Sequence, residues 1–390
     1  MKVGIFFLVI AYVLSQFYRA FLAVLSPVLA LDIGAGPQDL ALSSGLWFLT
    51  FAAMQIPVGE ALDRIGPRRT AAWLLGVAGG GGALLFALAQ TPLHLHLAMV
   101  LIGAGCAPVL MASYYIFGRM YPAAVFATLA GAIIGFGTLG NIAGAAPLAW
   151  AAEAFGWRQS VGALAAVTLM VALALWRFVQ DPPPLDAAQA RPGSVLDVLR
   201  LRGLWLILPL LFVNYAPAAG LRGLWVGPYV GQVYGAGLIS QATLIMAFAM
   251  VIGAFAYGPM DRLFGTRKGV VLVGNLLSGL CLLALWWMPG GGYWTSVTLL
   301  SLVGILGLSF PLIMAHGRSF LPPHLLGRGV TMLNMFSIGG VGILQVVSKQ
   351  VYAAAPPDPA SAAFGGLFLF FGVLVLAGCA IYVFSQDRTD

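Results

Sequence analysis

Two arginines stand alone in long apolar stretches of this 390-residue chain. Arg19 is the only charged residue between residues 3 and 30, and Arg222 is the only one between residues 204 and 230. A guanidinium group stays protonated in proteins, and its fork of N–H donors suits the oxygens of a carboxylate or phosphate. Because a charge inside an apolar segment is costly, we expect each arginine to face a polar interior and to bind an anion.

The acidic residues of the chain do not supply that anion in an obvious way. All 12 Asp and Glu residues fall at the ends of apolar runs or between them. The alternative is that each arginine bonds to backbone carbonyls or extends toward the interface, as Arg19 could toward Asp32. The sequence therefore favours an anionic solute as the partner of both arginines.

Polar and aromatic side chains in the apolar runs complete the candidate solute-binding set. They are Gln16, Tyr18, Gln55, Tyr114, Tyr115, Asn141, Asn214, Tyr215, Trp225 and Asn334. Polar residues in membrane helices more often join helices than contact a ligand, and Tyr and Trp near helix ends often lie at the membrane interface. Each is a weaker candidate than the two arginines.

The elements that position these residues are apolar helices. The chain is 61% hydrophobic and only 8% charged, whereas a soluble domain carries roughly 25% charged residues. A helix needs about 20 apolar residues to cross a bilayer, and alternation typical of a transmembrane barrel is absent. Twelve apolar runs fit, at about 3–30, 43–62, 70–90, 94–118, 122–152, 157–178, 204–230, 238–258, 269–288, 294–316, 327–352 and 362–384. We predict an all-α, twelve-span membrane protein.

The net charge of +7 reports topology rather than a nucleic-acid partner. Most of the 19 Lys and Arg residues fall between runs on the side of the N-terminus. The positive-inside rule then places both termini in the cytoplasm and the chain in the cell (inner) membrane. The three cysteines are scattered through the runs, so no disulfide framework is expected.

The chain consists of two similar halves. Residues 179–202 hold a triple proline and several charges, which predicts a cytoplasmic linker between residues 1–178 and 203–390. The turn "GEALDRIGPRRT" (59–70) in the first half matches "GPMDRLFGTRKG" (258–269) in the second. Each contains an Asp-Arg pair, then a glycine, then two basic residues. Arg19 and Arg222 occupy equivalent helices at near-equivalent depths.

These turns resemble the loop 2–3 motif of the major facilitator superfamily. The motif residues are Gly59, Asp63, Arg64, Gly66, Arg68 and Arg69, with Pro67 where a basic residue is usual. The second copy, with Asp261 and Arg262, has one extra residue before its glycine. "FGWRQ" (155–159) also resembles a string common between helices five and six of that family. The resemblance implies two pseudo-symmetric six-helix bundles that transport by alternating access, with Asp63 and Arg64 at the inner gate.

Secondary active transport of a small anionic solute is the function that these features predict. The arginine pair resembles that of the organic-phosphate exchangers of the superfamily and, more loosely, of its nitrate porters. We expect no cofactor, no nucleic acid and a monomer in the lipid bilayer. A proton or a counter-solute is the expected coupling partner.

Other functions are less well supported. Met246 and Met250 are spaced to offer two thioethers to Cu(I), which suits a copper importer, although methionines also serve as core filler. Drug or cation efflux would call for a carboxylate within a span. An enzyme would call for a metal-binding or phosphate-binding motif, and the sequence contains neither HExxH nor a P-loop.

Overall fold

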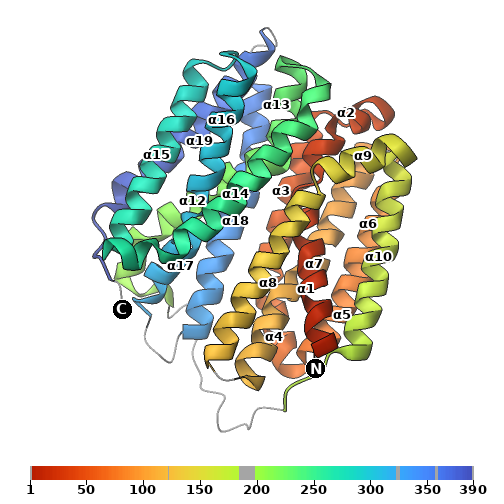
Figure 1. The fold of residues 1–390 in the computed structure, drawn as a ribbon, viewed down its shortest axis with the longest axis vertical. Coiled ribbons are helices and arrows are strands. Elements are labelled where there is room, and N and C mark those ends of the chain that lie inside the picture. Colours follow the sequence, from red (N-terminus) through yellow and green to blue (C-terminus); the bar gives the residue numbers. More distant parts are fainter. Residues whose placement is uncertain (1, 122, 184–197, 322–325, 356–358, 389–390) are drawn as a thin grey trace. The chain divides into compact units, whose positions relative to one another are not determined.

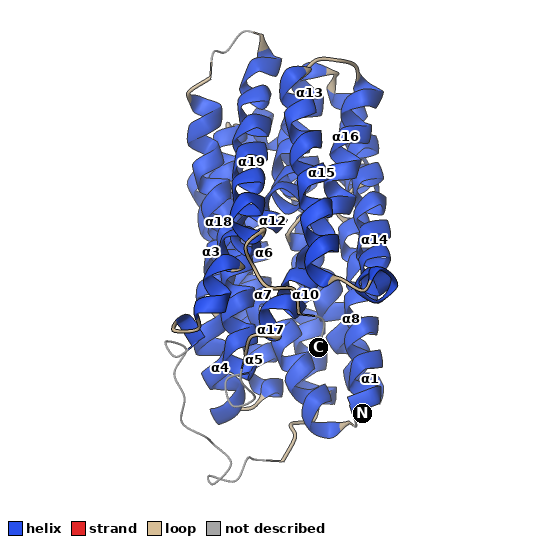
Figure 2. Ribbon diagram, turned by 90° about the vertical axis from the view of Figure 1, so that its left-hand side faces the viewer, coloured by secondary structure: helices blue, strands red, loops and turns tan. Residues whose placement is uncertain are grey.

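The computed structural model describes residues 2–121, 123–183, 198–321, 326–355 and 359–388. The chain divides into two compact units, Met1–Ala190 and Arg191–Asp390. Every regular element within the described residues is a helix, and none is a strand (Figure 2). The predicted boundaries of the linker, 179–202, remain a prediction because residues 184–197 lie outside the described part of the chain.

The first unit is a bundle whose helices run through the warm colours of Figure 1. Its elements are α1 (Lys2–Tyr18), α2 (Leu22–Ile33), α3 (Pro37–Ala53), α4 (Gln55–Arg64), α5 (Pro67–Trp73), the π-helical stretch η1 (Leu74–Gly80), α6 (Gly81–Ala87), α7 (Pro92–Met120), α8 (Ala123–Ala143), α9 (Ala146–Phe155) and α10 (Trp157–Phe178).

The second unit repeats this plan. Its elements are the short helix η3 (Arg202–Leu206), α12 (Leu208–Gly220), the π-helical turn η4 (Leu221–Trp225), α13 (Val226–Val233), η5 (Ala236–Leu238), α14 (Ile239–Phe264), α15 (Arg267–Trp287), α16 (Tyr293–Leu306), η6 (Gly307–Ser309), α17 (Phe310–Arg318), α18 (Leu326–Ala353) and α19 (Ala360–Tyr382).

The helices account for the predicted membrane spans. Ten are long and apolar enough to cross a membrane, and two bent pairs raise the number to as many as twelve in the described residues. The pair α1 and α2 bends by 52°, and the pair formed by the end of α8 and α9 bends by 41°. Each of the twelve predicted runs overlaps one of these spans or bent pairs, so the all-α membrane fold is confirmed.

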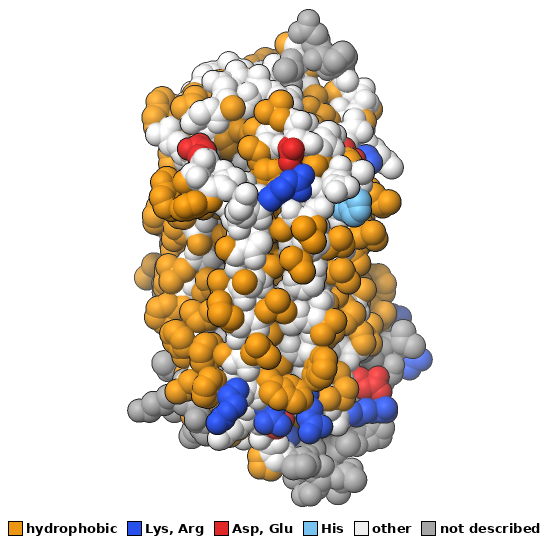
Figure 3. All heavy atoms as spheres, turned by 90° about the vertical axis from the view of Figure 1, so that its right-hand side faces the viewer, with side chains coloured by type: hydrophobic (Ala, Val, Ile, Leu, Met, Phe, Trp, Pro, Cys, Tyr) orange, Lys and Arg blue, Asp and Glu red, His pale blue; other side chains and the backbone are white. Residues whose placement is uncertain are grey.

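The surface suits a lipid environment. Figure 3 shows a face on which hydrophobic side chains cover the middle while Lys and Arg side chains gather at one end. On α10, Met170 and Leu173 are 60% and 70% exposed. Apolar exposure on this scale is unfavourable in water but favourable in lipid, and a basic end suits anionic headgroups.

Glycines bring the first and fifth spans of each unit into backbone contact. A Cβ at Gly140 of α8 would overlap the carbonyl oxygen of Val13 on α1. In the second unit, a Cβ at Gly340 of α18 would overlap the carbonyl oxygen of Phe212 on α12. Small residues permit this close approach of membrane helices. The two contacts are equivalent points of the repeat, since they lie 199 and 200 residues apart in the sequence.

Proline lies near the irregular turn that carries each arginine. Pro27 in α2 and Pro217 in α12 lack an N–H, so the carbonyl four residues earlier loses its helical donor. In α2, the Ser26 hydroxyl donates to that carbonyl, on Ala23, at 2.8 Å. The bend at residues 19–21 precedes Pro27, and the π-helical turn η4 follows Pro217. The spans are thus broken or widened where Arg19 and Arg222 lie.

Candidate functional site

Arg19 lies at the break between α1 and α2 and is held by aromatic rings. Its guanidinium carbon is 5.2 Å from the centroid of the Trp47 ring and 4.9 Å from that of Phe51, both on α3. These rings stack on each other with centroids 5.1 Å apart. Ring faces stabilise the cation without accepting its N–H groups in ordinary hydrogen bonds. The arrangement fixes the guanidinium group and leaves hydrogen-bonding capacity for an anion.

Asp32, the carboxylate that the sequence suggested as a partner of Arg19, binds other residues. Asp32 accepts hydrogen bonds from Arg158 Nη2 at 2.9 Å and from Trp157 Nε1 at 3.0 Å. Among the described side chains, no carboxylate forms an ion pair with Arg19. The interpretation that Arg19 extends toward Asp32 is therefore not supported.

Arg222 lies in the π-helical turn η4 and is only 3% exposed. Tyr215 lies two helical turns earlier, on α12. The Tyr215 ring in turn packs on Phe310 of α17 with centroids 5.0 Å apart. A guanidinium group buried among apolar helices is costly, and π-helical turns are frequent at functional sites. Arg222 therefore has the surroundings expected of a functional residue.

The repeat refines the relative depth of the two arginines. If Val13 and Phe212 are equivalent, Arg19 corresponds to Ala218, and Arg222 lies four residues further along its span. Four residues are about 6 Å of helix. The arginines are thus about one helical turn out of register within their own units.

Two buried glutamines are neighbours of Arg19. Gln16 precedes it by three residues, and Gln55 follows its ring partner Phe51 by four. Gln16 is 8% exposed, and its Nε2 donates to the Tyr12 hydroxyl at 3.0 Å. Gln55 is 1% exposed, and its Nε2 donates to the carbonyl of Phe51 at 3.2 Å. The Oε1 atom of each glutamine has no hydrogen-bond partner among the described residues. Both are candidates to contact a solute.

Three other predicted residues join helices within their own unit. The Tyr18 hydroxyl bonds to Thr168 of α10 at 2.9 Å. The Trp225 Nε1 donates to Ser348 of α18 at 3.0 Å. Asn214 donates to Asn275 of α15 and to Ser309 of η6, a polar cluster described further below. Interhelical linkage therefore accounts for Tyr18, Trp225 and the Nδ2 of Asn214 without a solute.

The remaining predicted residues are half-buried: Tyr114 and Tyr115 on α7, Asn141 on α8 and Asn334 on α18. The Tyr115 hydroxyl accepts a hydrogen bond of 3.3 Å from Arg119 Nη1. The guanidinium carbon of Arg119 lies 5.6 Å from the centroid of the Tyr115 ring.

Sequence reasoning missed three residues beside the candidates. Trp47 and Phe51 hold Arg19, but aromatic residues at helical spacing are typical of an apolar core and gave no signal. Gln345 of α18 is 1% exposed, and neither of its amide atoms has a partner in the described part of the chain. It packs against Gly220, whose added Cβ would lie 2.7 Å from its Nε2. An amide side chain in the middle of the apolar run 327–352 was a visible signal.

In each unit, a carboxylate from beyond the last span binds the repeated turn at the start of the third span. Gly66 has φ of +95°, a conformation that favours glycine, and α5 begins directly after it. Asp181, beyond the end of α10, accepts a hydrogen bond of 2.7 Å from the Arg68 backbone N–H. In the second unit, Asp387, beyond the end of α19, accepts one of 2.9 Å from the Lys268 N–H. Both turns are thus closed by a carboxylate from the last span of the unit.

The other motif residues differ in how far the structure constrains them. Arg64 pairs with Glu60 at 3.0 Å on the surface, and Arg69 is exposed. Asp261 accepts hydrogen bonds from Arg267 at 3.1 and 3.2 Å. A Cβ at Gly59 would meet nothing within 4 Å. The side chains of Asp63 and Arg262 lie outside the described part of the structure, so their gating role stays a prediction.

The methionine pair is packed as core. Met246 and Met250 are 1% and 6% exposed, and both contact the position of Gly304 on α16. No group of three or more His, Cys, Asp or Glu side chains in the described residues could hold a metal ion.

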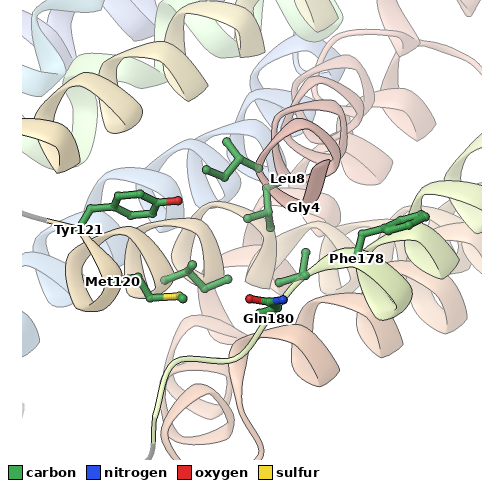
Figure 4. Close-up of a pocket in the computed structure, with 9 residues that line it drawn as sticks. Gly4, Leu8, Met120, Tyr121, Phe178 and Gln180 are labelled. Atoms are coloured by element: carbon green, nitrogen blue, oxygen red, sulfur yellow. The ribbon is translucent and has the colours of Figure 1, made fainter. Parts of the chain in front are cut away.

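A small pocket in the first unit lies away from the candidate residues. Gly4 and Leu8 of α1, Met120 at the end of α7 and Phe178 at the end of α10 line it, together with Tyr121 and Gln180 (Figure 4). Its walls are largely apolar and carry no charged side chain. We assign no chemistry to this pocket.

Comparison with known proteins identifies the fold and the family. The Major Facilitator Superfamily profile matches residues 8–258, and no curated protein matches the sequence. A bacterial homologue of the human lysosomal transporter Spinster is 19% identical with a TM-score of 0.73, covering 98% of this chain and 96% of its own. The nucleoside transporter NupG is 14% identical with a TM-score of 0.78, covering 98% and 99%. A D-xylose–proton symporter is 15% identical with a TM-score of 0.76, covering 99% and 98%.

The solved structures share the fold of almost the whole chain, and the family match points to transport rather than catalysis. They agree with the repeated turns, the bent spans and the apolar surface. The chain belongs to the Major Facilitator Superfamily and is a multi-pass membrane protein that acts as a secondary transporter of small solutes.

Proposed function

We propose that the chain transports a small organic anion and that Arg19 and Arg222 bind it. The observation that carries the proposal is Arg19, a cation at the break of a membrane span with aromatic rings against it and no carboxylate partner among the described residues. Arg222 supports it from the equivalent span of the other unit. A carboxylate or phosphate matches the guanidinium fork through two parallel hydrogen bonds.

Transport then follows the alternating-access scheme of the family. The inner turns with Asp63, Arg64 and Asp261 act as gates that close when the solute site opens to the outside. A proton or a counter-solute drives the cycle, and the protein works as a monomer. These statements extend the family assignment to this chain.

We also propose that the protein lies in the inner membrane of the cell with both termini in the cytoplasm. The test is labelling of a Ser194→Cys variant in which the three native cysteines are replaced. Membrane-impermeant maleimide should react from the cytoplasmic side in inverted vesicles and not in intact cells. Labelling in intact cells alone would contradict the orientation.

The anion proposal is tested by solute binding to the purified protein. Thermal unfolding in detergent is followed with gluconate, glycerol 3-phosphate, glucose, a cationic dye and Cu(I). We expect stabilisation by at least one organic anion, and loss of that stabilisation in Arg19→Gln and Arg222→Gln. Arg318→Gln, an exposed arginine at the end of α17, is the matched control and should behave as wild type. Stabilisation by the cation or by copper alone would refute the proposal.

A further inference from the structure

The hydrogen bond that Gln55 makes within the protein determines whether its free amide atom is a donor or an acceptor. Its Nε2 donates to the Phe51 carbonyl, which can only accept, so the amide cannot be turned over without placing two acceptors together. The atom left open is therefore Oε1, an acceptor, in a side chain that is 1% exposed. Gln16 also has its Oε1 open, with Nε2 on the Tyr12 hydroxyl, but a hydroxyl both donates and accepts, so the orientation argument rests on Gln55.

Asn214 in the second unit also has an open acceptor. The orientation of its amide is fixed by a series of hydrogen bonds. Asn275 donates from Nδ2 to the Val271 carbonyl at 2.8 Å, which turns its Oδ1 toward Asn214. Asn214 must then donate from Nδ2 to that oxygen, at 2.5 Å, and to Ser309 at 2.9 Å. Its Oδ1 is left without a partner among the described residues although the side chain is 2% exposed. Buried open acceptors thus occur in both units.

The open acceptors of the first unit lie close to Arg19. Trp47, Phe51 and Gln55 follow one another at intervals of four residues, so they share one face of α3 and its continuation in α4. The Arg19 guanidinium carbon is over Phe51, the middle member. Gln16 lies about one turn before Arg19 on α1. Gln55 is therefore one helical turn along the chain from Phe51, which contacts Arg19, and Gln16 is about one turn from Arg19 itself, so both glutamines are neighbours of the arginine along their helices.

A carboxamide oxygen is a poor neighbour for a simple anion because both groups only accept hydrogen bonds. A buried acceptor without a donor is also destabilising. We propose that Gln16 and Gln55 select solutes that carry hydroxyl donors beside the anionic group, so that the substrate is a hydroxylated organic anion. An ammonium donor would be repelled by the Arg19 charge at this range. The inference rests on the proposed function and names the substrate class within it.

Matched pairs of solutes test this selectivity on the purified full-length protein. The pairs are gluconate and hexanoate, shikimate and cyclohexanecarboxylate, and glycerol 3-phosphate and propyl phosphate, with 6-aminohexanoate as the ammonium arm. We expect at least one hydroxylated member to bind about tenfold or more tightly than its counterpart, as one or two hydrogen bonds of ordinary strength would give. Equal binding within every pair that binds, binding of 6-aminohexanoate alone, or no binding by any hydroxylated member would overturn the inference.

Variants assign the selectivity to the glutamines. Gln55→Met and Gln16→Met keep the side-chain length and remove the oxygen, so each should reduce the preference for the hydroxylated member by about threefold to tenfold. Gln90→Met, an exposed glutamine of the same unit, is the control and should keep the wild-type preference. An unchanged preference in folded Gln55→Met and Gln16→Met proteins would remove these residues from the account. The solute pairs on the wild type still decide the substrate class if a variant does not fold.

The outcome also separates this inference from the proposed function. If the unhydroxylated anions bind equally and Arg19→Gln abolishes both, the anion proposal stands and the hydroxyl inference fails. If gluconate and neutral glucose bind equally and Arg19→Gln changes neither, donor recognition stands and the anion proposal fails.

Discussion

The carboxylate of Asp181 accepts a 2.7 Å hydrogen bond from the backbone N–H of Arg68, and so joins the end of the last span of the first unit to the start of α5. The Arg68 side chain adds a 3.4 Å ion pair with the same carboxylate. Asp387 repeats the relationship with the Lys268 N–H at the start of α15. A negative charge at a helix N-terminus also interacts favourably with the helix dipole. The repeated turn of each unit is therefore a three-part structure of motif, helix start and distant carboxylate.

Removing the first of these carboxylates should loosen the turn. We expect Asp181→Ala to lower the free energy of unfolding by about 1 kcal/mol, the usual cost of losing an N-terminal cap. Denaturant unfolding in detergent measures this difference. Glu153→Ala removes an exposed carboxylate of α9 from the same unit and should have no effect. Equal stability of the Asp181→Ala and Glu153→Ala proteins would show that the contact does not stabilise the turn.

The second carboxylate makes a pH-dependent contribution. Partial burial acts to raise the pKa of Asp387, but hydrogen bonds from the Thr266 hydroxyl and the Lys268 N–H outweigh it and hold the pKa below its ordinary value of 3.8. A depressed folded-state pKa means that this stabilisation is present above pH 3.8 and is lost as the pH falls through the folded-state value. The Tm gap between wild type and Asp387→Ala should therefore be full at neutral pH and narrow in acid. A gap that widens in acid would contradict the assignment.

Arg158 of the "FGWRQ" string should stabilise the opposite end of the first unit. It donates to Asp32 at 2.9 Å and to the carbonyls of Ala87 and Ala89 at 3.2 and 2.6 Å, so one side chain joins three spans. Because the pair is partly exposed, we expect Arg158→Gln to cost only about 1 kcal/mol of unfolding free energy. Arg177→Gln, an exposed arginine of α10, is the control. Identical unfolding curves for the two variants would argue against a joining role for Arg158.

The membrane spans were predictable because apolar length is a direct signal of a bilayer span. The break at Arg19 and the π-helical turn at Arg222 were not, since they depend on how Pro27 and Pro217 are accommodated by their neighbours. The partners of the repeated turns could not be predicted for another reason. Asp181 and Asp387 lie more than a hundred residues from the motifs that they close, at separations of 113 and 119. No local pattern links such positions.

The candidate site was predictable only in part. The two arginines and Gln55 stand out in the sequence because a charge or amide in an apolar run needs a reason. Which polar side chains are already used by the protein depends on packing. Tyr18, Asn214 and Trp225 bond to Thr168, Asn275 and Ser348, and each partner comes from a distant part of the sequence. Only the folded chain shows which atoms of these side chains are already bonded and which stay open.

The methionine pair offers a test of the copper alternative. Met246 packs in the core against Gly304, and a Met-to-Leu exchange in a core is well tolerated. We expect Met246→Leu to change stability by less than about 1.5 kcal/mol and to leave solute transport intact. Uptake assays in proteoliposomes with and without added Cu(I) measure this. Loss of copper-dependent transport in Met246→Leu, with no organic anion transported, would favour copper.

The central claim is that Arg19 and Arg222 bind the same anion, and a double-mutant cycle of transport tests it most directly. The measurement is proteoliposome uptake of a radiolabelled organic anion that stabilises the purified protein, by wild type, Arg19→Ala, Arg222→Ala and the double variant. Each single change should cost about 2–4 kcal/mol of solute affinity, and Arg→Lys should restore little because an ammonium lacks the planar fork. The double variant should lose much less than the sum of the two single losses, because both arginines act on one ligand. Uptake at the wild-type rate by both single variants, or losses that simply add, would contradict the claim.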